Sequence, residues 1–255
     1  MNKDTLRQIL VAVAVLATIA INVLANALPL NGLNTGEISD RFEVYFTPAG
    51  YVFSIWGLIY LGLIGFAIYQ ALPSQQGNPA LRRIGPLFVA SSAANIAWLF
   101  FWHYEVFTLT LPAMLILLAC LIAIYLRLGV GRASIGAAER WLVHVPFSVY
   151  LGWITVATIA NVTSLLDYLQ WGGWGIAETT WTVAVLAVAV AVAAAVTWTR
   201  RDAAYLLVLV WAFAGIAVKH PATPIVATAA WTAAVLVAAL ALGSLIAPRR
   251  ATKGT

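Results

Sequence analysis

Tryptophan and asparagine side chains recur at helical spacing in several apolar stretches of this sequence. Asn95 and Trp98 are separated by one helical turn, and Tyr150, Trp153 and Asn161 fall at i, i+3 and i+11. Indole rings have flat apolar faces and one N–H donor, and carboxamides offer both donors and acceptors. Together, such side chains could stack on a planar apolar ligand and form a few hydrogen bonds with it.

A further aromatic group lies in the stretch Pro48–Tyr60, which reads PAGYVFSIWGLIY and contains Tyr51, Phe53, Trp56 and Tyr60. Wound as a helix, Phe53, Trp56 and Tyr60 share one face. This face suits anchoring at a lipid interface, and it suits equally well the wall of a pocket for a flat ligand. The pattern alone leaves both interpretations open.

Residues for acid–base, metal or nucleophilic chemistry are sparse. No predicted span holds a pair of carboxylates, and neither a metal-ligand spacing nor a nucleophile elbow occurs. His144 could ligate haem, but a histidine at a helix end more commonly contacts headgroups or backbone. We therefore expect no catalytic residues and no metal, and favour binding over catalysis, although the sequence leaves enzymatic activity undecided.

The elements that must position these side chains follow from composition. The chain has 255 residues, of which 63% are hydrophobic and 9% charged, with a mean hydropathy of +0.93. A soluble domain carries about 25% charged residues, so this chain cannot cover a water-exposed surface. We predict an all-α, polytopic transmembrane bundle whose main partner is the lipid bilayer. The basic pI does not indicate nucleic acid, because no basic cluster with interleaved polar residues occurs.

Eight apolar runs are long enough to cross a bilayer, although the seventh is short. They lie near 7–28, 49–72, 84–103, 106–126, 142–166, 179–198, 203–219 and 223–246. We group the first five spans into a bundle at 1–169 and the last three into an extension at 170–255.

The basic residues predict the orientation. With eight spans, 12 of the 14 lysines and arginines fall on the side that carries both termini. The positive-inside rule makes that side cytoplasmic and indicates a multi-pass protein of a bacterial inner membrane. The first run could be misread as a signal peptide, but it is longer than a typical h-region, so we favour a retained helix.

This topology brings amides and aromatic rings of four helices to one level near the outer side. The residues are Asn22, Asn26, Tyr51, Phe53, Trp56, Asn95, Trp98, Tyr150, Trp153 and Asn161. Because an unpartnered amide is costly in hydrocarbon, the asparagines should face the bundle interior. The alternatives are helix-to-helix hydrogen bonds of about 0.6 kcal/mol and tryptophans of an interfacial belt. The outer loop at 29–47 could be a lid over this level or a solvated connector.

Four motifs in order resemble the TspO/MBR family of tryptophan-rich sensory and translocator proteins. The first is PAGYVFSIWGLIY, and the second runs from Asn95 to Phe101 as NIAWLFF. The third, Val145–Trp153, reads VPFSVYLGW, and the fourth, Ala157–Asn161, reads ATIAN. The resemblance covers about residues 7–168. This sequence departs from the family pattern in having a single proline in the first motif and three further helices.

The resemblance implies a five-helix membrane fold, often dimeric, with a pocket beneath the loop between the first two helices. Family members bind porphyrins and, in some cases, sterols. Carried over, the ligand-facing residues are Trp56, Tyr60, Asn95, Trp98, Trp153 and Asn161. We therefore expect a planar hydrophobic ligand, foremost a porphyrin or related tetrapyrrole, bound for sensing, transport or sequestration, with no required cofactor. The alternatives are a secondary transporter of a small hydrophobic molecule and a scaffold subunit of a membrane complex.

Overall fold

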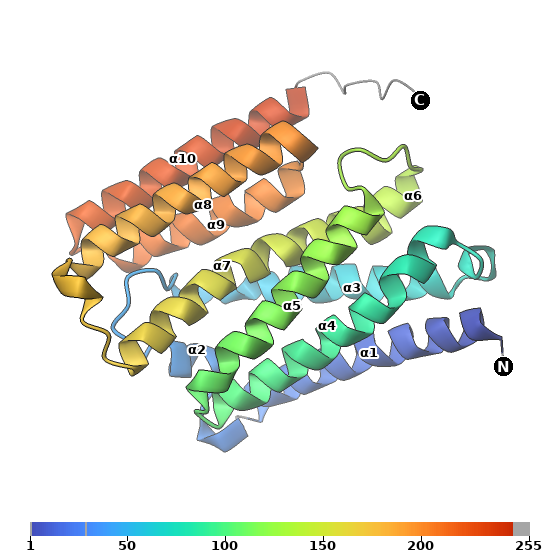
Figure 1. Ribbon diagram of the computed structural model, residues 1–255, viewed down its shortest axis with the longest axis horizontal. Helices are drawn as coiled ribbons and strands as arrows, with labels where there is room; N and C mark the ends of the chain where they lie inside the picture. Colours follow the sequence, from blue (N-terminus) through green and yellow to red (C-terminus); the bar gives the residue numbers. More distant parts are fainter. Residues whose placement is uncertain (1, 29, 247–255) are drawn as a thin grey trace.

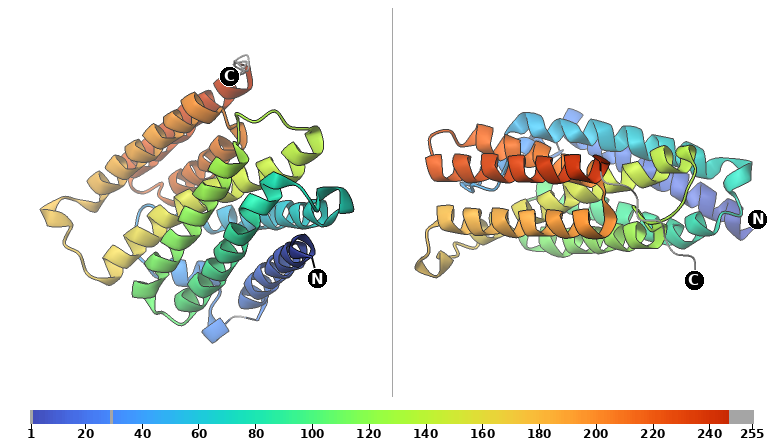
Figure 2. Two further views of the ribbon diagram at one scale, coloured as in Figure 1. Left: turned by 45° about the vertical axis from the view of Figure 1, so that its right-hand side comes forward. Right: turned by 90° about the horizontal axis from the view of Figure 1, so that it is seen from above.

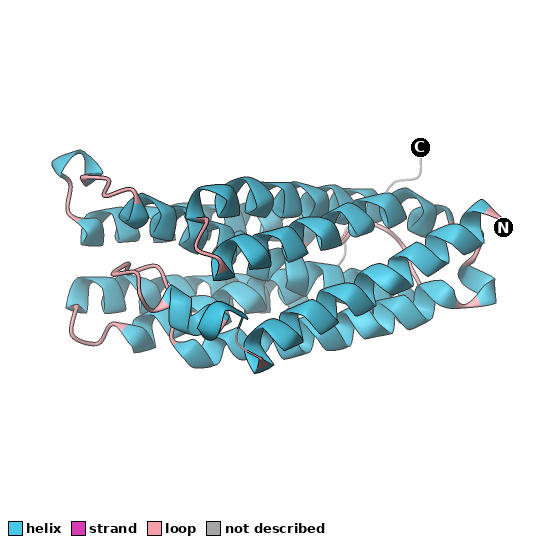
Figure 3. Cartoon of the chain, turned by 90° about the horizontal axis from the view of Figure 1, so that it is seen from below, coloured by secondary structure: helices cyan, strands magenta, loops and turns pink. Residues whose placement is uncertain are grey.

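The computed structural model describes residues 2–28 and 30–246, which form a bundle of long helices (Figure 1). The long helices are α1 (Lys3–Ala27), α3 (Ile55–Ala71), α4 (Pro79–His103), α5 (Phe107–Leu128), α7 (Val145–Tyr168), α8 (Glu178–Arg200), α9 (Ala203–Lys219) and α10 (Pro224–Ile246). Short helical segments are η1 (Leu30–Gly32), α2 (Thr35–Ser39), η2 (Gly50–Ser54), η3 (Pro73–Gln75), α6 (Ala137–Glu139), η4 (Arg140–His144) and η5 (Gly173–Gly175). The described residues contain helices and loops and no strand (Figure 3).

The predicted all-α, polytopic membrane fold is confirmed. Seven helices of the described chain are long and apolar enough to cross a membrane. α9, the short seventh span of the prediction, has 17 residues. At helical rise it is about 25 Å long, the lower limit for a span. It is also among the better buried helices, because it packs against α7 and α10.

The first five long helices close into a ring. Contacts join α1 to α4, α4 to α5, α5 to α7, α7 to α3 and α3 back to α1. The remaining helices attach through α9, which packs on α7 and on η2, while α10 packs on α9 and α8 (Figures 1 and 2). α8, α9 and α10 therefore lie beside α7, away from α1 and α4.

α9 approaches η2 closely because a glycine faces it. A Cβ on Gly215 would lie 2.2 Å from Cγ2 of Val52, so only glycine allows this approach. Ala49 N donates to Gly215 O at 3.1 Å, and Trp211 Nε1 donates to Val52 O at 3.1 Å. The turn η2, which leads into α3, is thus held to α9 by one backbone and one indole hydrogen bond.

The two ends of the bundle differ in charge. We call the end that carries α2 the lid end, and the end where α1 begins the terminal end. The described lysines and arginines at the terminal end are Lys3, Arg7, Arg82, Arg83, Arg127, Arg132, Arg140, Arg200 and Arg201, whereas Arg41 and Lys219 lie at the lid end. The remaining three basic residues fall outside the described part of the chain. The predicted separation of basic residues by side therefore appears in the described helices.

Candidate functional site

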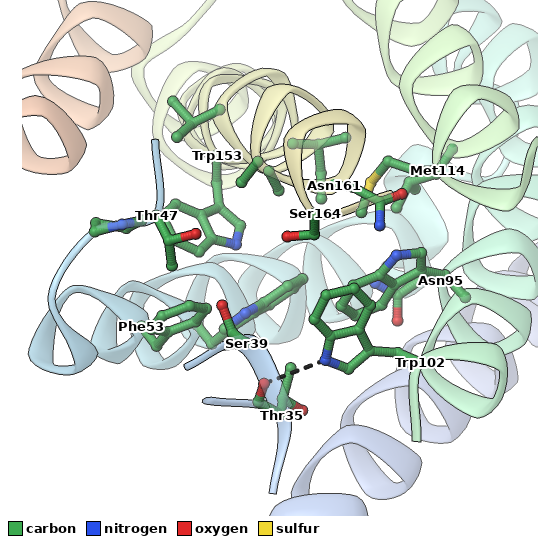
Figure 4. Close-up of a pocket in the computed structure, with 18 residues that line it drawn as sticks. Thr35, Ser39, Thr47, Phe53, Asn95, Trp102, Met114, Trp153, Asn161 and Ser164 are labelled. Atoms are coloured by element: carbon green, nitrogen blue, oxygen red, sulfur yellow. Dashed lines mark hydrogen bonds between the residues drawn. The ribbon is translucent and has the colours of Figure 1, made fainter. Parts of the chain in front are cut away.

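A small cavity of about 60 Å³ lies inside the ring at the lid end (Figure 4). α3, α4, α5 and α7 form its walls, and the segment between α1 and η2 covers it. Its lining residues are Thr35, Ser39, Thr47, Pro48, Phe53, Trp56, Asn95, Trp98, Trp102, Met114, Leu117, Trp153, Ile154, Val156, Ala157, Ala160, Asn161 and Ser164. We call this space the chamber.

Aromatic rings from four helical segments, η2, α3, α4 and α7, form most of the chamber wall. Trp153 of α7 meets Phe53 edge-on, with ring centroids 5.7 Å apart, and meets Trp56 at 6.4 Å. Trp98 and Trp102 of α4 stack at 5.4 Å with an interplanar angle of 19°. These tryptophans point into the protein rather than to lipid, so they form the wall of a pocket.

Two amides of the chamber are each held by one hydrogen bond to a side chain of a neighbouring helix. Asn22 Nδ2 of α1 donates to Asn95 Oδ1 at 2.8 Å. Asn161 Nδ2 of α7 donates to Thr110 Oγ1 of α5 at 2.9 Å. The bonded half of each amide fixes the side chain, and the other half stays unbonded. The same asparagines therefore form helix-to-helix hydrogen bonds and also present unbonded amide groups to the chamber.

Five buried polar atoms of the chamber lining have no hydrogen-bond partner. Three are donors, Asn95 Nδ2, Trp98 Nε1 and Trp153 Nε1, and one is an acceptor, Asn161 Oδ1. The fifth, Thr47 Oγ1, can act as either. A buried polar group without a partner costs about 1–3 kcal/mol. Five of them around one apolar chamber are therefore costly unless another molecule supplies their partners.

The segment between α1 and η2 is a lid rather than a solvated connector. Residues 35, 39, 47 and 48 of this segment line the chamber, and Ile38, Phe46 and Thr47 are almost fully buried. Trp102 Nε1 donates to Thr35 O at 3.2 Å, as Figure 4 shows. We call residues 30–49 the lid.

The lid is tied to the bundle at several points. The Thr35 hydroxyl lies 3.1 Å from His103 Nε2, and Thr35 N donates to Asn26 Oδ1 at 3.1 Å. Arg41 forms a two-point ion pair with Glu105. These contacts join the lid to α1 and α4, near where α4 ends.

Six of the eleven predicted site residues line the chamber, namely Phe53, Trp56, Asn95, Trp98, Trp153 and Asn161. Tyr60 stacks on Trp56 at 5.6 Å, and Tyr150 meets the same indole edge-on at 6.0 Å, so both lie behind the wall. Asn22 is buried against Asn95.

The last two predicted residues lie away from the chamber wall. Asn26 is exposed at the end of α1 and accepts a hydrogen bond from the lid. Tyr51 is 48% exposed and packs edge-on against Trp211 of α9. Both therefore contribute to the surroundings of the chamber.

Other lining residues carry weaker signals in the sequence. Ser164 continues the α7 stripe one turn beyond Asn161, so periodicity could have found it. Met114 of α5 carries no such signal, because a methionine in an apolar run is ordinary core. Thr35, Ser39 and Thr47 depend on how the lid packs on the bundle, and the one local pattern in the lid, the Asn34–Glu37 capping box, starts α2 without specifying that packing.

The chamber lining combines aromatic rings with neutral polar groups. None of the residues that line it is titratable, so it offers no general acid, base or charged nucleophile. No group of three or more His, Cys, Asp or Glu side chains that could hold a metal occurs in the described residues. His144 is buried at the start of α7 and does not line the chamber. What the walls can do is stack, exclude water and offer a few hydrogen bonds.

Comparison with known proteins identifies one family. The family model described as TSPO-like protein matches residues 8–243. The match continues beyond the motifs of the first 168 residues and extends through α8 and α9 into α10. No curated protein and no solved structure matches the chain.

Proposed function

The chain belongs to the family of TSPO-like proteins, and on this premise we propose that it binds a planar hydrophobic ligand in the chamber, foremost a tetrapyrrole. The observation that carries this proposal is the set of five unpartnered buried polar atoms on aromatic walls. A flat conjugated ring with polar atoms at its edge can stack on the indoles of Trp98 and Trp153. It can also meet the free amide groups of Asn95 and Asn161.

The closed chamber is too small for such a ligand. Its volume is about 60 Å³, whereas small-molecule sites typically measure about 300–1,000 Å³. Binding must therefore lift the lid, which hydrogen bonds and ion pairs hold at its edges. Because the lining has no charged side chain, ionised groups of the ligand would stay outside, next to the lid.

We further propose that the protein senses, carries or sequesters its ligand in a bacterial cytoplasmic membrane. The basic residues at the terminal end support a cytoplasmic location for both termini, with the lid on the opposite side. Binding without turnover is favoured because the chamber has no titratable group.

The test is titration of the purified protein with protoporphyrin IX, followed by the absorbance of the porphyrin. We expect saturable one-site binding that weakens about tenfold in Trp153→Leu, because the indole face and its N–H are both lost. Trp198→Leu is the matched control, since Trp198 is 83% exposed and outside the chamber. Absence of saturable binding, or equal affinities of both variants, would reject the proposal.

A further inference from the structure

A second and larger hollow lies at the lid end, outside the helix ring. Its volume is about 610 Å³, and it lies between the lid, the end of α7 and the start of α8. It is lined by Val44, Tyr45, Phe46, Thr163, Leu166, Asp167, Gln170, Trp171, Gly172, Gly173, Gly175, Ile176, Ala177, Glu178, Trp181, Thr182 and Val185. We call it the outer groove. Residues 44–46 of the lid line the outer groove and residues 47–48 line the chamber, so the lid separates the two.

Indole rings gather on the α8 side of the outer groove. Trp171, Trp174 and Trp181 contact one another, with ring centroids 5.3, 5.5 and 5.8 Å apart. Trp181 Nε1 donates to Gly173 O at 3.0 Å, which fixes its ring against the η5 turn. Trp171 and Trp181 line the groove and stay partly accessible. Fixed, partly accessible indole faces are the preferred surfaces for a cation.

Uncompensated negative charge gathers at the same place. Asp167 and Glu178 line the outer groove, and Glu43 directly precedes the lining residue Val44. Among the described residues, none of these three acids forms an ion pair. The lining contains no lysine or arginine.

The two basic residues described at the lid end are already engaged in ion pairs. Arg41 pairs with Glu105, and Lys219 pairs with Asp40 at 2.7 Å. The lysines and arginines described at the lid end are these two, so neither neutralises the groove. The outer groove therefore presents indole faces and carboxylates without a cation of its own.

From this arrangement we infer that the outer groove is a second ligand site and that it takes an amphiphilic organic cation. The positive group, an ammonium, would lie between Asp167, Glu178 and the indole of Trp181, and the apolar body would lie along the lid. The volume is within the range of about 300–1,000 Å³ that small-molecule sites occupy. Such a ligand differs from that of the chamber, whose lining has no charge.

The same chemistry could come from a free cationic molecule or from the choline headgroup of a lipid. Both present a quaternary ammonium next to apolar groups. The two sources differ in whether the surrounding bilayer already occupies the groove, so the lipid composition of the sample distinguishes them.

The test uses the full-length protein in nanodiscs of phosphatidylglycerol and the probe benzyltrimethylammonium, with binding measured by isothermal titration calorimetry. We expect saturable binding that falls at least about tenfold in the double variant Asp167→Asn/Glu178→Gln. Trp181→Leu should weaken binding of the probe by a similar factor. The controls Glu139→Gln and Trp198→Leu remove an acid and an exposed indole outside the groove and should bind as the unaltered protein does.

Two results would overturn the inference. One is equal affinity for neopentylbenzene, the uncharged isostere of the probe. The other is unchanged binding in the double variant. This second result can be obtained even if Trp181→Leu fails to fold. Repeating the titration in phosphatidylcholine identifies the source. Weaker apparent binding there supports a headgroup as the occupant, and equal binding supports a free cation.

Discussion

The ammonium of Lys219, the last residue of α9, lies 2.7 Å from Oδ1 of Asp40, which ends the lid helix α2. This ion pair connects residues 179 positions apart and joins the C-terminal part of the chain to the cover of the chamber. Together with the hydrogen bonds between α9 and η2, it gives α9 a structural role beside the chamber.

Removing the Lys219 ammonium should speed ligand exchange with little effect on stability. The side chains of Lys219 and Asp40 are 24% and 58% exposed, and an exposed ion pair contributes about 0–1 kcal/mol. We expect Lys219→Gln to raise both association and dissociation rates of protoporphyrin IX, measured by stopped flow. Arg82→Gln breaks the Asp4 pair at the terminal end and is the control, which should leave both rates unchanged. Identical rates in the two variants would contradict a role of the Lys219–Asp40 ion pair in holding the lid closed.

Adding a side chain at Gly215 should push α9 away from η2, the turn that leads into α3. The new Cβ would lie 2.2 Å from Val52 Cγ2, and overpacking of this kind costs about 1–3 kcal/mol. We expect Gly215→Ala to lower the midpoint of thermal unfolding in detergent and to weaken porphyrin binding. Gly243→Ala is the control, because a Cβ there meets no atom within 4 Å. Val52→Ala in the Gly215→Ala background should restore part of the loss, and failure to do so would place the strain elsewhere.

The hydrogen bond between Asn22 and Asn95 should contribute to stability independently of ligand. A double-mutant cycle with Asn22→Leu and Asn95→Leu should give a coupling energy of about 0.6 kcal/mol, and at most about 1.7 kcal/mol. Porphyrin affinity should fall in Asn95→Leu, which loses the free Nδ2 of the chamber, more than in Asn22→Leu. Equal losses of affinity would mean that the pair acts only through structure.

Periodicity predicted the helices well because each span must satisfy its own backbone in lipid and is therefore read from local sequence. It also located Asn95, Trp98, Trp153 and Asn161 on facing helices, since residues at one depth on inward faces have to meet. The spacing of Phe53 and Trp56 was less direct, because Gly50–Ser54 forms a 3-10 turn before α3 begins. Both side chains nevertheless line the chamber.

The long-range contacts could not be predicted in the same way. A lysine at the end of an apolar run has no partner that the sequence specifies, whereas in the structure Lys219 pairs with Asp40. Asp202 lies between two helices, where no periodic pattern marks it, yet it is only 7% exposed. Both placements depend on how α9 packs against the ring, and a single sequence contains no periodic signal for the register between two helices.

Acidification should weaken the junction between α9 and the lid through His220. Burial, and secondarily the neighbouring Lys219, hold the pKa of His220 below its ordinary value. The ring packs edge-on against Tyr45 of the lid at 5.3 Å. Below about pH 6.5 the unfolded chain takes up a proton that the folded protein resists, so the free energy of unfolding falls.

We expect the unfolding midpoint to drop between about pH 7.5 and about pH 5.5, and the drop to be smaller in His220→Asn. Hydrogen exchange of the lid amides over the same range should show where the loosening occurs. Equal pH dependence in the two proteins would exclude His220 as the cause.

Asp202 should have the opposite dependence on pH. Its Oδ1 accepts from the backbone N–H groups of Ala204 and Tyr205 at 3.1 and 3.3 Å, which caps α9, while Oδ2 is buried without a hydrogen bond. Burial raises the pKa of this carboxyl above its ordinary value, and the nearby hydroxyls of Tyr125 and Ser148 only partly oppose that. The folded protein therefore binds this proton more readily than the unfolded chain, and stability is lost as the pH rises through the raised pKa.

Asparagine at position 202 keeps the cap, because it is as good an N-cap residue as aspartate, and it removes the buried charge. We expect Asp202→Asn to raise the unfolding midpoint at neutral pH and to approach the unaltered protein as the pH falls below the raised pKa, where the carboxyl is protonated. Asp202→Ala should instead be less stable by about 1 kcal/mol at the acidic end, since the cap is lost. Glu139→Gln, at a partly exposed acid of the same end of the bundle, should leave the midpoint unchanged. A lower midpoint of Asp202→Asn at neutral pH would show that the ionised carboxylate stabilises the fold, contrary to its burial.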